Sequence, residues 1–369
     1  MRRSGEVDRR ESRQVRVGKV AIGGGAPVTV QTMTKTDTRD VAATVDEIRR
    51  LAMAGADIVR LAVVDAEAAV ALGAIKREVG DFPLVADIHF DYRLALEALR
   101  QGVDKIRINP GNIGAEWKVR EVVAACRERG VPIRIGVNSG SIERPLLEKY
   151  GRSPRAMVES ALRHVEILER MDFQDIVISL KASDVPTMVA AYEEIAREVP
   201  YPLHLGVTEA GPGLAAAVKS AVGIGHLLAE GIGDTIRVSI TGDAAEEVAV
   251  GLEILYALGL REKRLEIVSC PTCGRCEVDL FRIVHEVEQR MPPVERPLRV
   301  AIMGCGVNGP GEAREADIGL ASGNGVGLIF RKGQVLRKVP EREMVDVLLE
   351  EIARLGRAGE ASEPVGAGS

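Results

Sequence analysis

From residue 28 onward, short apolar runs alternate with polar turns and amphipathic segments at intervals of about thirty residues. An apolar run followed by an amphipathic segment predicts a strand followed by a helix. Eight such units predict an α/β fold, a (β/α)8 TIM-type barrel of parallel strands ringed by helices. The predicted strands are Val28–Met33, Ile58–Val63, Leu84–His89, Lys105–Asn109, Ile133–Asn138, Ile176–Lys181, Leu203–Thr208 and Thr235–Ile240.

The segment before the first strand predicts a small hairpin that covers the barrel floor, with Gly23, Gly24 and Gly25 at its turn. A phosphate-binding loop is the weaker interpretation, because the turn lacks the Gly-Lys-Ser/Thr ending of a P-loop. The longest connection, residues 139–154, follows the fifth strand, where barrels carry active-site loops.

A smaller α+β domain is expected after the eighth helix, which ends near Gly259. We therefore expect a barrel over residues 1–264, a cluster domain over 265–356 and a disordered tail over 357–369. The first fourteen residues are charged and could be disordered. The predicted elements of the second domain are a strand Leu265–Ser269, a helix Glu277–Arg290, a strand Arg299–Met303, two further strands and a helix Glu341–Leu355.

Composition excludes several classes of function. The 369 residues are 46% hydrophobic, and 54 acidic residues outnumber 49 Lys and Arg to give a net charge of −5. This balance argues against nucleic acid or a membrane surface as partner. No apolar run reaches the roughly eighteen residues of a membrane span. Clustered cysteines are typical of metal-binding thiolates in a reducing cytoplasm, so we expect a cytoplasmic protein.

Four of the five cysteines lie in two short stretches, Ser269-Cys270-Pro-Thr-Cys273-Gly-Arg-Cys276 and Gly304-Cys305 with the glycine-rich run that ends at Glu312. A Cys-x2-Cys pair places two thiolates on one tight turn, where they can hold a soft cation. Such a set suits either tetrahedral zinc or an iron–sulfur cluster, and the spacing does not separate the two. The nearby carboxylate suggests a weaker, exchangeable ligand.

The inward-facing positions of the barrel strands are unusually polar, although branched aliphatic side chains normally fill a barrel. Several cations in one cavity repel each other unless an anion balances them. We therefore infer a small phosphorylated substrate at the C-terminal mouth of the barrel. The residues that share the inward face are Asp87, His89, Lys105, Arg107, Asn109, Arg134, Asn138, Ser179, Lys181, Arg237 and Ser239.

Structural roles compete with the functional interpretation at several of these positions. Arg60 and Arg237 could pair with an acid such as Asp87 in a buried network. Lys105 begins its strand, which favours a structural role, and His89 could be a buried histidine with satisfied hydrogen bonds. Glu209, directly after the seventh strand, is the better candidate for proton transfer.

Motifs along nearly the whole chain resemble the 4-hydroxy-3-methylbut-2-enyl diphosphate synthases of the non-mevalonate isoprenoid pathway. The matching stretches are VQTMTKTDT, ADIHFDYRLA, KIRINPGNIG, RIGVNSGS, ISLKASD, GVTEAGPG, RVSITGD, SCPTCGR and MGCGVNGPGEAREADIG. Only the first fourteen residues and the tail fall outside them. Some relatives have an extra domain between the barrel and the cluster domain, but the short span from Gly259 to Cys270 predicts the two-domain form.

The resemblance implies a [4Fe-4S] cluster held by Cys270, Cys273, Cys305 and Glu312. It implies the reductive opening of 2-C-methyl-D-erythritol 2,4-cyclodiphosphate, with Glu209 and Glu312 as catalytic residues and flavodoxin or ferredoxin as electron donor. It also implies a head-to-tail homodimer. The residues expected to bind the cyclic diphosphate, from the strand pattern and the resemblance together, are Arg60, Asp87, His89, Arg107, Asn109, Arg134, Asn138, Ser179, Lys181, Thr208 and Ser239.

Two rival functions stay open at this point. The second domain could be a structural zinc knuckle with Cys276 as its fourth ligand, on a barrel of other chemistry, or the chain could be an iron–sulfur electron carrier. Cys276 departs from the family pattern, and we expect it to begin the following helix, where it either faces away from the metal site or is a bystander thiol.

Overall fold

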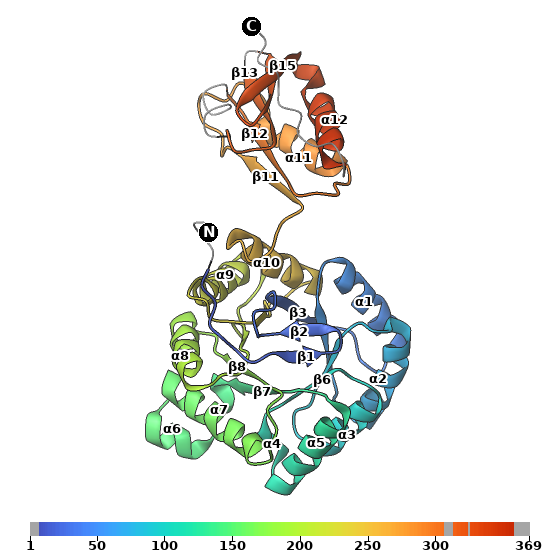
Figure 1. Cartoon of the computed structure of the whole chain (residues 1–369), viewed down its shortest axis with the longest axis vertical. Coiled ribbons are helices and arrows are strands. Elements are labelled where there is room, and N and C mark those ends of the chain that lie inside the picture. The colour runs from blue at the N-terminus through green and yellow to red at the C-terminus, as the bar shows by residue number, and fades with distance from the viewer. Residues whose placement is uncertain (1–6, 306–312, 324, 358–369) are drawn as a thin grey trace. The chain divides into compact units, whose positions relative to one another are not determined.

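The computed structural model describes residues 7–305, 313–323 and 325–357. The chain divides into two compact units, Met1–Arg261 and Glu262–Ser369 (Figure 1). The boundary expected from the sequence lies slightly further along the chain, after residue 264.

Within the described residues, the first unit holds eight parallel strands in the order β8-β7-β6-β5-β4-β3-β10-β9. A parallel bridge between Ile178 and Leu203 joins the two ends of this sheet, so the sheet closes into the predicted barrel. The strands are β3 (Thr29–Met33), β4 (Ile58–Ala62), β5 (Leu84–Asp87), β6 (Lys105–Ile108), β7 (Ile133–Asn138), β8 (Ile176–Lys181), β9 (His204–Leu205) and β10 (Thr235–Ile236).

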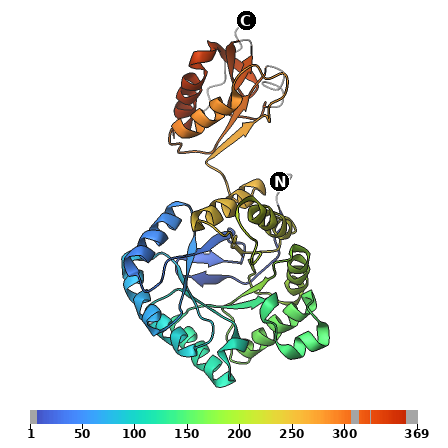
Figure 2. The same cartoon turned by 180° about the vertical axis from the view of Figure 1, so that it is seen from behind.

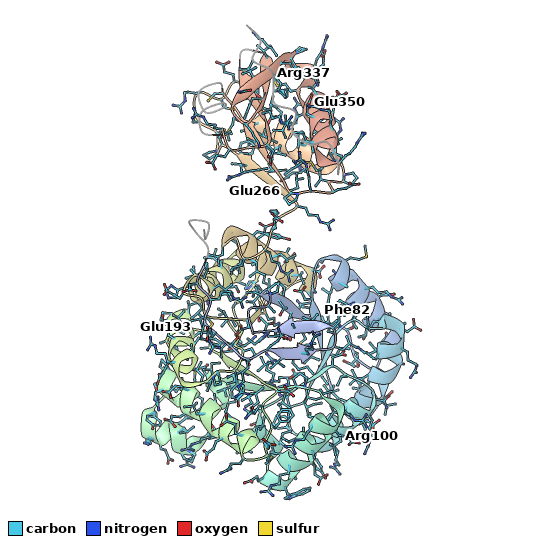
Figure 3. All side chains as sticks on the ribbon, in the orientation of Figure 1. Phe82, Arg100, Glu193, Glu266, Arg337 and Glu350 are labelled. Carbon is cyan, nitrogen blue, oxygen red and sulfur yellow. The ribbon has the colours of Figure 1, made fainter. Side chains whose placement is uncertain are left out.

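A ring of helices surrounds the strands in both views (Figure 1 and Figure 2). Many of these helices begin just after a side chain such as that of Asp40, Asp65 or Asp184, which accepts a hydrogen bond from a backbone amide of the first turn. Charged side chains such as Arg100 and Glu193 project outward from the ring (Figure 3). The helices are α1 (Val41–Met53), α2 (Ala66–Val79), α3 (Tyr92–Arg100), α4 (Pro110–Ile113), α5 (Glu116–Arg129), α6 (Arg144–Tyr150), α7 (Pro154–Glu169), α8 (Val185–Glu198), α9 (Gly213–Ala229) and α10 (Ala244–Ala257).

A hairpin of β1 (Val15–Val17) and β2 (Val20–Ile22) covers the barrel floor. Val17 and Ile22 form a buried cluster with Ile58 and Val85, which point inward at the lower ends of β4 and β5. The predicted position of the turn was wrong. The chain turns at residues 18–19, and the glycine triplet follows β2, where Gly23 approaches the carbonyl of residue 13 too closely for a side chain.

The charged segment before this hairpin is also ordered, contrary to the expectation of disorder, over its described residues. Arg10 donates to the backbone carbonyls of Val199 and Tyr201, and Arg9 pairs with the buried carboxylate of Asp234. Both arginines therefore bind groups of the barrel floor and do not simply face solvent. A high content of charged residues does not by itself reveal such contacts, so the order could not be predicted from it.

The second unit contains a five-stranded sheet in the order β11-β12-β13-β14-β15, with α11 and α12 packed on it. Three strands follow β12 rather than the predicted two. Lys332 and Gly333, both with positive φ, form the two-residue turn between the last two strands. The elements are β11 (Leu265–Ser269), α11 (Leu280–Arg290), β12 (Leu298–Met303), β13 (Ile318–Gly323), β14 (Val326–Arg331), β15 (Gln334–Pro340) and α12 (Met344–Gly356).

Candidate active site

The strand register places a group of charged side chains at one level inside the barrel. Asp87 of β5 pairs in register with Arg107 of β6, which in turn pairs with Arg134 of β7. Residues at paired positions of parallel strands project to the same face of the sheet. All three side chains are buried, so the predicted polar lining of the barrel is present.

Asp87 is the carboxylate at the centre of this group. Its Oδ1 lies 3.2 Å from Nη1 of Arg107, and its Oδ2 lies 3.8 Å from Nε of Arg60 and 3.4 Å from Nε2 of His89. Burial favours the neutral carboxyl, but attraction to Arg60 and the contacts with His89 and Arg107 outweigh it and hold the pKa of Asp87 well below its usual range. The buried network that the sequence left open for Arg60 and Asp87 therefore exists.

Arg237 is paired with a different acid from the one considered above. Its Nη2 lies 3.4 Å from Oε2 of Glu247, whose carboxylate also accepts hydrogen bonds from the hydroxyl of Thr32 and the amide of Ile240. Sequence reasoning missed Glu247. A charged residue on the otherwise apolar inner face of α10 was the available signal.

Positive charge exceeds negative charge in this interior. Arg134 and Lys181 are buried, and no carboxylate of the described residues forms a salt bridge with either of them. Nε and Nη1 of Arg134 are buried without a hydrogen-bond partner. Burial, with repulsion from Arg237 and Arg134, lowers the pKa of Lys181 well below its ordinary value. Against the acids Asp87 and Glu247 stand the basic side chains of Arg60, Lys105, Arg107, Arg134, Lys181 and Arg237.

Two glycines leave room for these cations. A Cβ atom at Gly136 would lie 2.5 Å from Nε of Arg107, and one at Gly206 would lie 2.7 Å from Nζ of Lys181. Both distances are far shorter than van der Waals contact. A side chain at either position would clash with the neighbouring cation, and one at Gly206 would also lie 2.6 Å from the backbone carbonyl oxygen of Arg237.

A cavity of about 540 Å³ opens at the C-terminal ends of β7, β8 and β9. Asn138, Thr208 and Glu209, three of the predicted site residues, line it together with Arg152 and Asp184. Glu209 has a φ of +52°, a conformation that is strained for a residue other than glycine. Such conformations are concentrated at functional sites, and Glu209 lies at this cavity.

The remaining predicted barrel residues are placed less closely together. The hydroxyl of Ser179 donates to the carbonyl of Ile135 at 3.4 Å, so this group is engaged with the neighbouring strand. Asn109 is buried, and Ser239 is partly buried just after β10. His89 is more than half exposed, which rules out the buried-histidine interpretation.

The cysteines of the second unit line one small cavity. Cys270 directly follows β11 and Cys305 follows β12, and these strands pair in parallel, so both loops emerge at the same edge of the sheet. The amide of Gly304 lies 3.4 Å from Sγ of Cys270. Thr272, between Cys270 and Cys273, has a φ of +62°, which tightens the turn. The cavity measures about 120 Å³ and is lined by Cys270, Pro271, Thr272, Cys273, Arg275, Cys276, Gly304 and Cys305.

Cys276 does not begin the following helix or face away from the site, which leaves the bystander-thiol alternative open. Its side chain lines the cavity, and a Cβ atom at Gly304 would lie 2.4 Å from its sulfur. The physical reason is that α11 begins only at Leu280, where Asp279 caps the helix, so Cys276 still belongs to the cysteine loop. Its thiol donates to the carbonyl of Val278 at 3.3 Å.

The donor set consists of thiols around one cavity, and thiolate is the usual ligand of iron–sulfur clusters, so the residues present fit such a group. Among the described residues, no three His, Cys, Asp or Glu side chains are spaced to hold one metal ion. Glu312, the fourth ligand implied by the resemblance, lies outside the described residues.

Family models match both units of the chain. The GcpE TIM-barrel domain matches residues 12–252, and the GcpE protein C-terminal domain matches residues 266–354. The chain belongs to the GcpE family. The two GcpE regions follow each other directly, as the predicted two-domain form requires.

Relatives of this GcpE family member are similar over almost their whole length. A 4-hydroxy-3-methylbut-2-en-1-yl diphosphate synthase (flavodoxin) of Geobacter sulfurreducens is 60% identical, over 94% of this chain and 98% of the relative. Proteins of the same name from Symbiobacterium thermophilum and Clostridium perfringens are 59% and 57% identical, each over 93% of this chain and over 93% and 99% of the relative.

A solved structure supports the barrel fold alone. The Yersinia pestis DHPS with a pterine-sulfa conjugate aligns with a TM-score of 0.50 at 11% identity, over 67% of this chain and all of that chain. Among the described residues, no helix is both long and apolar enough to cross a membrane.

Proposed function

We propose that this GcpE family member reductively opens the ring of 2-C-methyl-D-erythritol 2,4-cyclodiphosphate to give 4-hydroxy-3-methylbut-2-enyl diphosphate. Relatives at 55–60% identity that carry the name of this synthase support the activity. The observation in the molecule that carries it is the excess of buried positive charge in the barrel, which a diphosphate would balance. We place the protein in the cytoplasm, where the thiols stay reduced.

The barrel cations are proposed to hold the diphosphate. Arg107 and Arg134 lie at paired positions of neighbouring strands, and Lys181 lies two strands from Arg107, so the three donor groups converge from one side of the barrel. Arginine forks match phosphate oxygens in a bidentate way, and Lys181 adds a point charge. Asp87 is proposed to orient Arg60 and Arg107 and to face the hydroxyl groups of the substrate, because its charge would repel the phosphates.

Glu209 is proposed to deliver a proton to the departing hydroxyl group of the substrate. It lines the cavity together with Thr208 and Asn138, and its backbone has a positive φ. In the overall change, the carbon–oxygen bond to the ring phosphate breaks, a hydroxyl leaves as water after taking up a proton, and two electrons are consumed.

Cys270, Cys273 and Cys305, with Glu312, would hold a [4Fe-4S] cluster in the second unit. When bound, the cluster supplies electrons one at a time and offers an iron with a displaceable ligand. We propose a flavodoxin or ferredoxin as the electron donor, and flavodoxin is the donor in the names of the relatives. We also propose a head-to-tail homodimer, in which the cluster of one subunit serves the barrel of the other.

Substrate binding to an Arg134→Met variant tests the anion site. Loss of one charged contact to phosphate is worth about 1.5–3 kcal/mol, so the dissociation constant should rise on the order of 10- to 100-fold in anaerobic calorimetry without reductant. The free variant should be more stable than the wild type, by about 1–4 kcal/mol, because a buried cation without a counter-charge is removed. Misfolding would give the opposite change in stability.

Arg100→Met, on the exposed surface of α3, is the matched control and should bind the substrate normally. Unchanged binding by Arg134→Met together with intact cluster absorbance would support an electron carrier instead. A colourless protein with one tightly bound zinc after anaerobic purification would contradict the redox function.

A further inference from the structure

Lys105 lies one level deeper in the barrel than the proposed anion site. It begins β6 and points inward like Arg107, two residues later on the same strand. Its side chain is fully buried. Among the described residues, its amine nitrogen has one hydrogen-bond partner, Oε1 of Gln31 on β3 at 3.2 Å. A lysine ammonium can donate three hydrogen bonds, so this group is poorly satisfied as a cation.

Within the part of the chain that the structure describes, the surroundings of Lys105 contain positive and neutral groups but no acid in contact with it. The charged side chains that face it are those of Arg60 from β4 and Arg134 from β7, and both repel an ammonium. His204 from β9 is fully buried nearby, with Nδ1 3.3 Å from the hydroxyl of Thr235. The interior acids Asp87 and Glu247 are already engaged with Arg60, Arg107 and Arg237.

Several other polar atoms in this interior are also unsatisfied. Nε2 of Gln31, Nε2 of His204 and Oγ1 of Thr29 are buried without a hydrogen-bond partner, as are Nε and Nη1 of Arg134. Burial, reinforced by repulsion from Arg134 and Arg60, lowers the pKa of Lys105 well below its ordinary value. The free barrel therefore favours a neutral amine at this position, because a further charge would have no partner.

We propose that Lys105 takes up a proton from solution when the cyclic diphosphate binds above it, so that substrate binding and protonation of this buried amine are coupled. The proposal deepens the proposed function, because the bound anion supplies the negative charge that the interior lacks. The only bond formed is one N–H bond, made by the amine lone pair with a proton that solvent or buffer gives up, and there is no redox change. Lys105 is a positioning residue. Its charge acts on the substrate indirectly, through its electrostatic interaction with Arg134 and Arg60.

The substrate itself does not obscure this exchange. Each phosphorus of a cyclic diphosphate carries one strongly acidic oxygen and has no second ionisation near neutral pH. Protons taken up on binding must therefore come to the protein. Lys181 and His204 are also buried bases of this interior. Burial and repulsion from cations that include Arg134 lower the pKa of both groups, so both can contribute to the number of protons taken up.

The sign of the pH dependence follows from linkage. The pKa of Lys105 is lowered in the free barrel and rises in the complex, so the complex binds more protons. Affinity should therefore fall as pH rises through the window above the pKa of the free state and below the pKa of the complex. Uptake of one proton gives a loss of up to about tenfold in affinity per pH unit in that window.

Calorimetric titration of the full-length protein with the cyclic diphosphate, without reductant, tests the proposal. Titrations in two buffers of different ionisation enthalpy give the number of protons exchanged. We expect net uptake by the wild type, about one proton fewer in Lys105→Met, and a flatter dependence of affinity on pH in that variant. Lys105→Arg should also lose the uptake but keep affinity at high pH, because arginine stays charged.

Lys19→Met, which removes an exposed lysine, should exchange the same number of protons as the wild type. Substrate binding without proton uptake would overturn the proposal and leave the proposed function intact. Uptake that Lys105→Met leaves unchanged would also overturn it, by assigning the proton to Lys181 or His204. Failure of the folded wild type to bind the substrate at all would contradict the proposed function itself.

Discussion

Replacing Asp87 with Asn should destabilise the barrel strongly. The substitution keeps the shape of the side chain but removes the negative charge that contacts Arg107 at 3.2 Å and Arg60 at 3.8 Å. Removing one partner of a buried ion pair costs about 3–5 kcal/mol, because the remaining charges lose their compensation. In the variant, Arg60, Arg107 and Arg134 would repel each other without this nearby carboxylate. A bound anion, or the more distant carboxylate of Glu247, would reduce that repulsion.

The size of the effect can be read from thermal unfolding. For a domain of this size, 1 kcal/mol corresponds to a shift of about 2–4 °C, so Asp87→Asn should lower the melting temperature of the barrel by about 6–20 °C. Differential scanning calorimetry of the full chain gives this value. Added substrate should raise the melting temperature of the variant more than that of the wild type, since the diphosphate replaces the missing charge.

The difference in stability between the wild type and Asp87→Asn should depend on pH in a predictable direction. The pKa of Asp87 is lowered in the folded state, so its contribution is fully present above the pKa of an unfolded aspartate, near 4, and is lost as pH falls further. The difference between wild type and variant should therefore shrink in acid. Asp81→Asn, at an exposed pair with Lys19, is the matched control and should leave the melting temperature almost unchanged. An Asp87→Asn melting temperature equal to that of the wild type would refute the reasoning.

Three further predictions concern other parts of the molecule. Gly206→Ala should displace Lys181 and press on the backbone carbonyl of Arg237, and so raise the KM for substrate at least about tenfold in the anaerobic assay, with little loss of cluster colour. Cys276→Ser should retain most of the iron in elemental analysis, whereas Cys273→Ser should lose it, and the reverse result would reassign the ligands. Ile22→Ala should lower the free energy of unfolding by about 2–5 kcal/mol in urea, because Ile22 is fully buried at the barrel floor; no change would show that the hairpin is dispensable.

Much of the candidate site could be predicted because the barrel fixes the direction of side chains along each strand. Once eight strand and helix units were recognised, alternation placed Asp87, Arg107 and Arg134 inward, and the register then put them at one level. The cysteine spacing similarly predicted one thiol-lined site. The roles of the individual residues stay predictions until the experiments above are done.

Other features depended on contacts between segments far apart in the chain. The pairing of Glu247 with Arg237, and of Arg9 and Arg10 with the barrel floor, cannot be read from local sequence, although a charge on the apolar face of α10 marks Glu247 as unusual. Cys276 was misplaced because the start of α11 is set by the cap at Asp279 and not by propensity in the loop.

The sequence by itself determined the order of the strands and helices, the inward face of each strand and the grouping of the cysteines, because hydrophobic periodicity and close spacing are local properties. Only the tertiary structure decided which charges are compensated. Asp87 meets Arg60 and Arg107, Glu247 meets Arg237, and Lys105, Arg134 and Lys181 are buried without an acidic partner among the described residues. The physical reason is that charge compensation depends on distances across a closed barrel, and strand closure sets those distances only when the whole chain has folded.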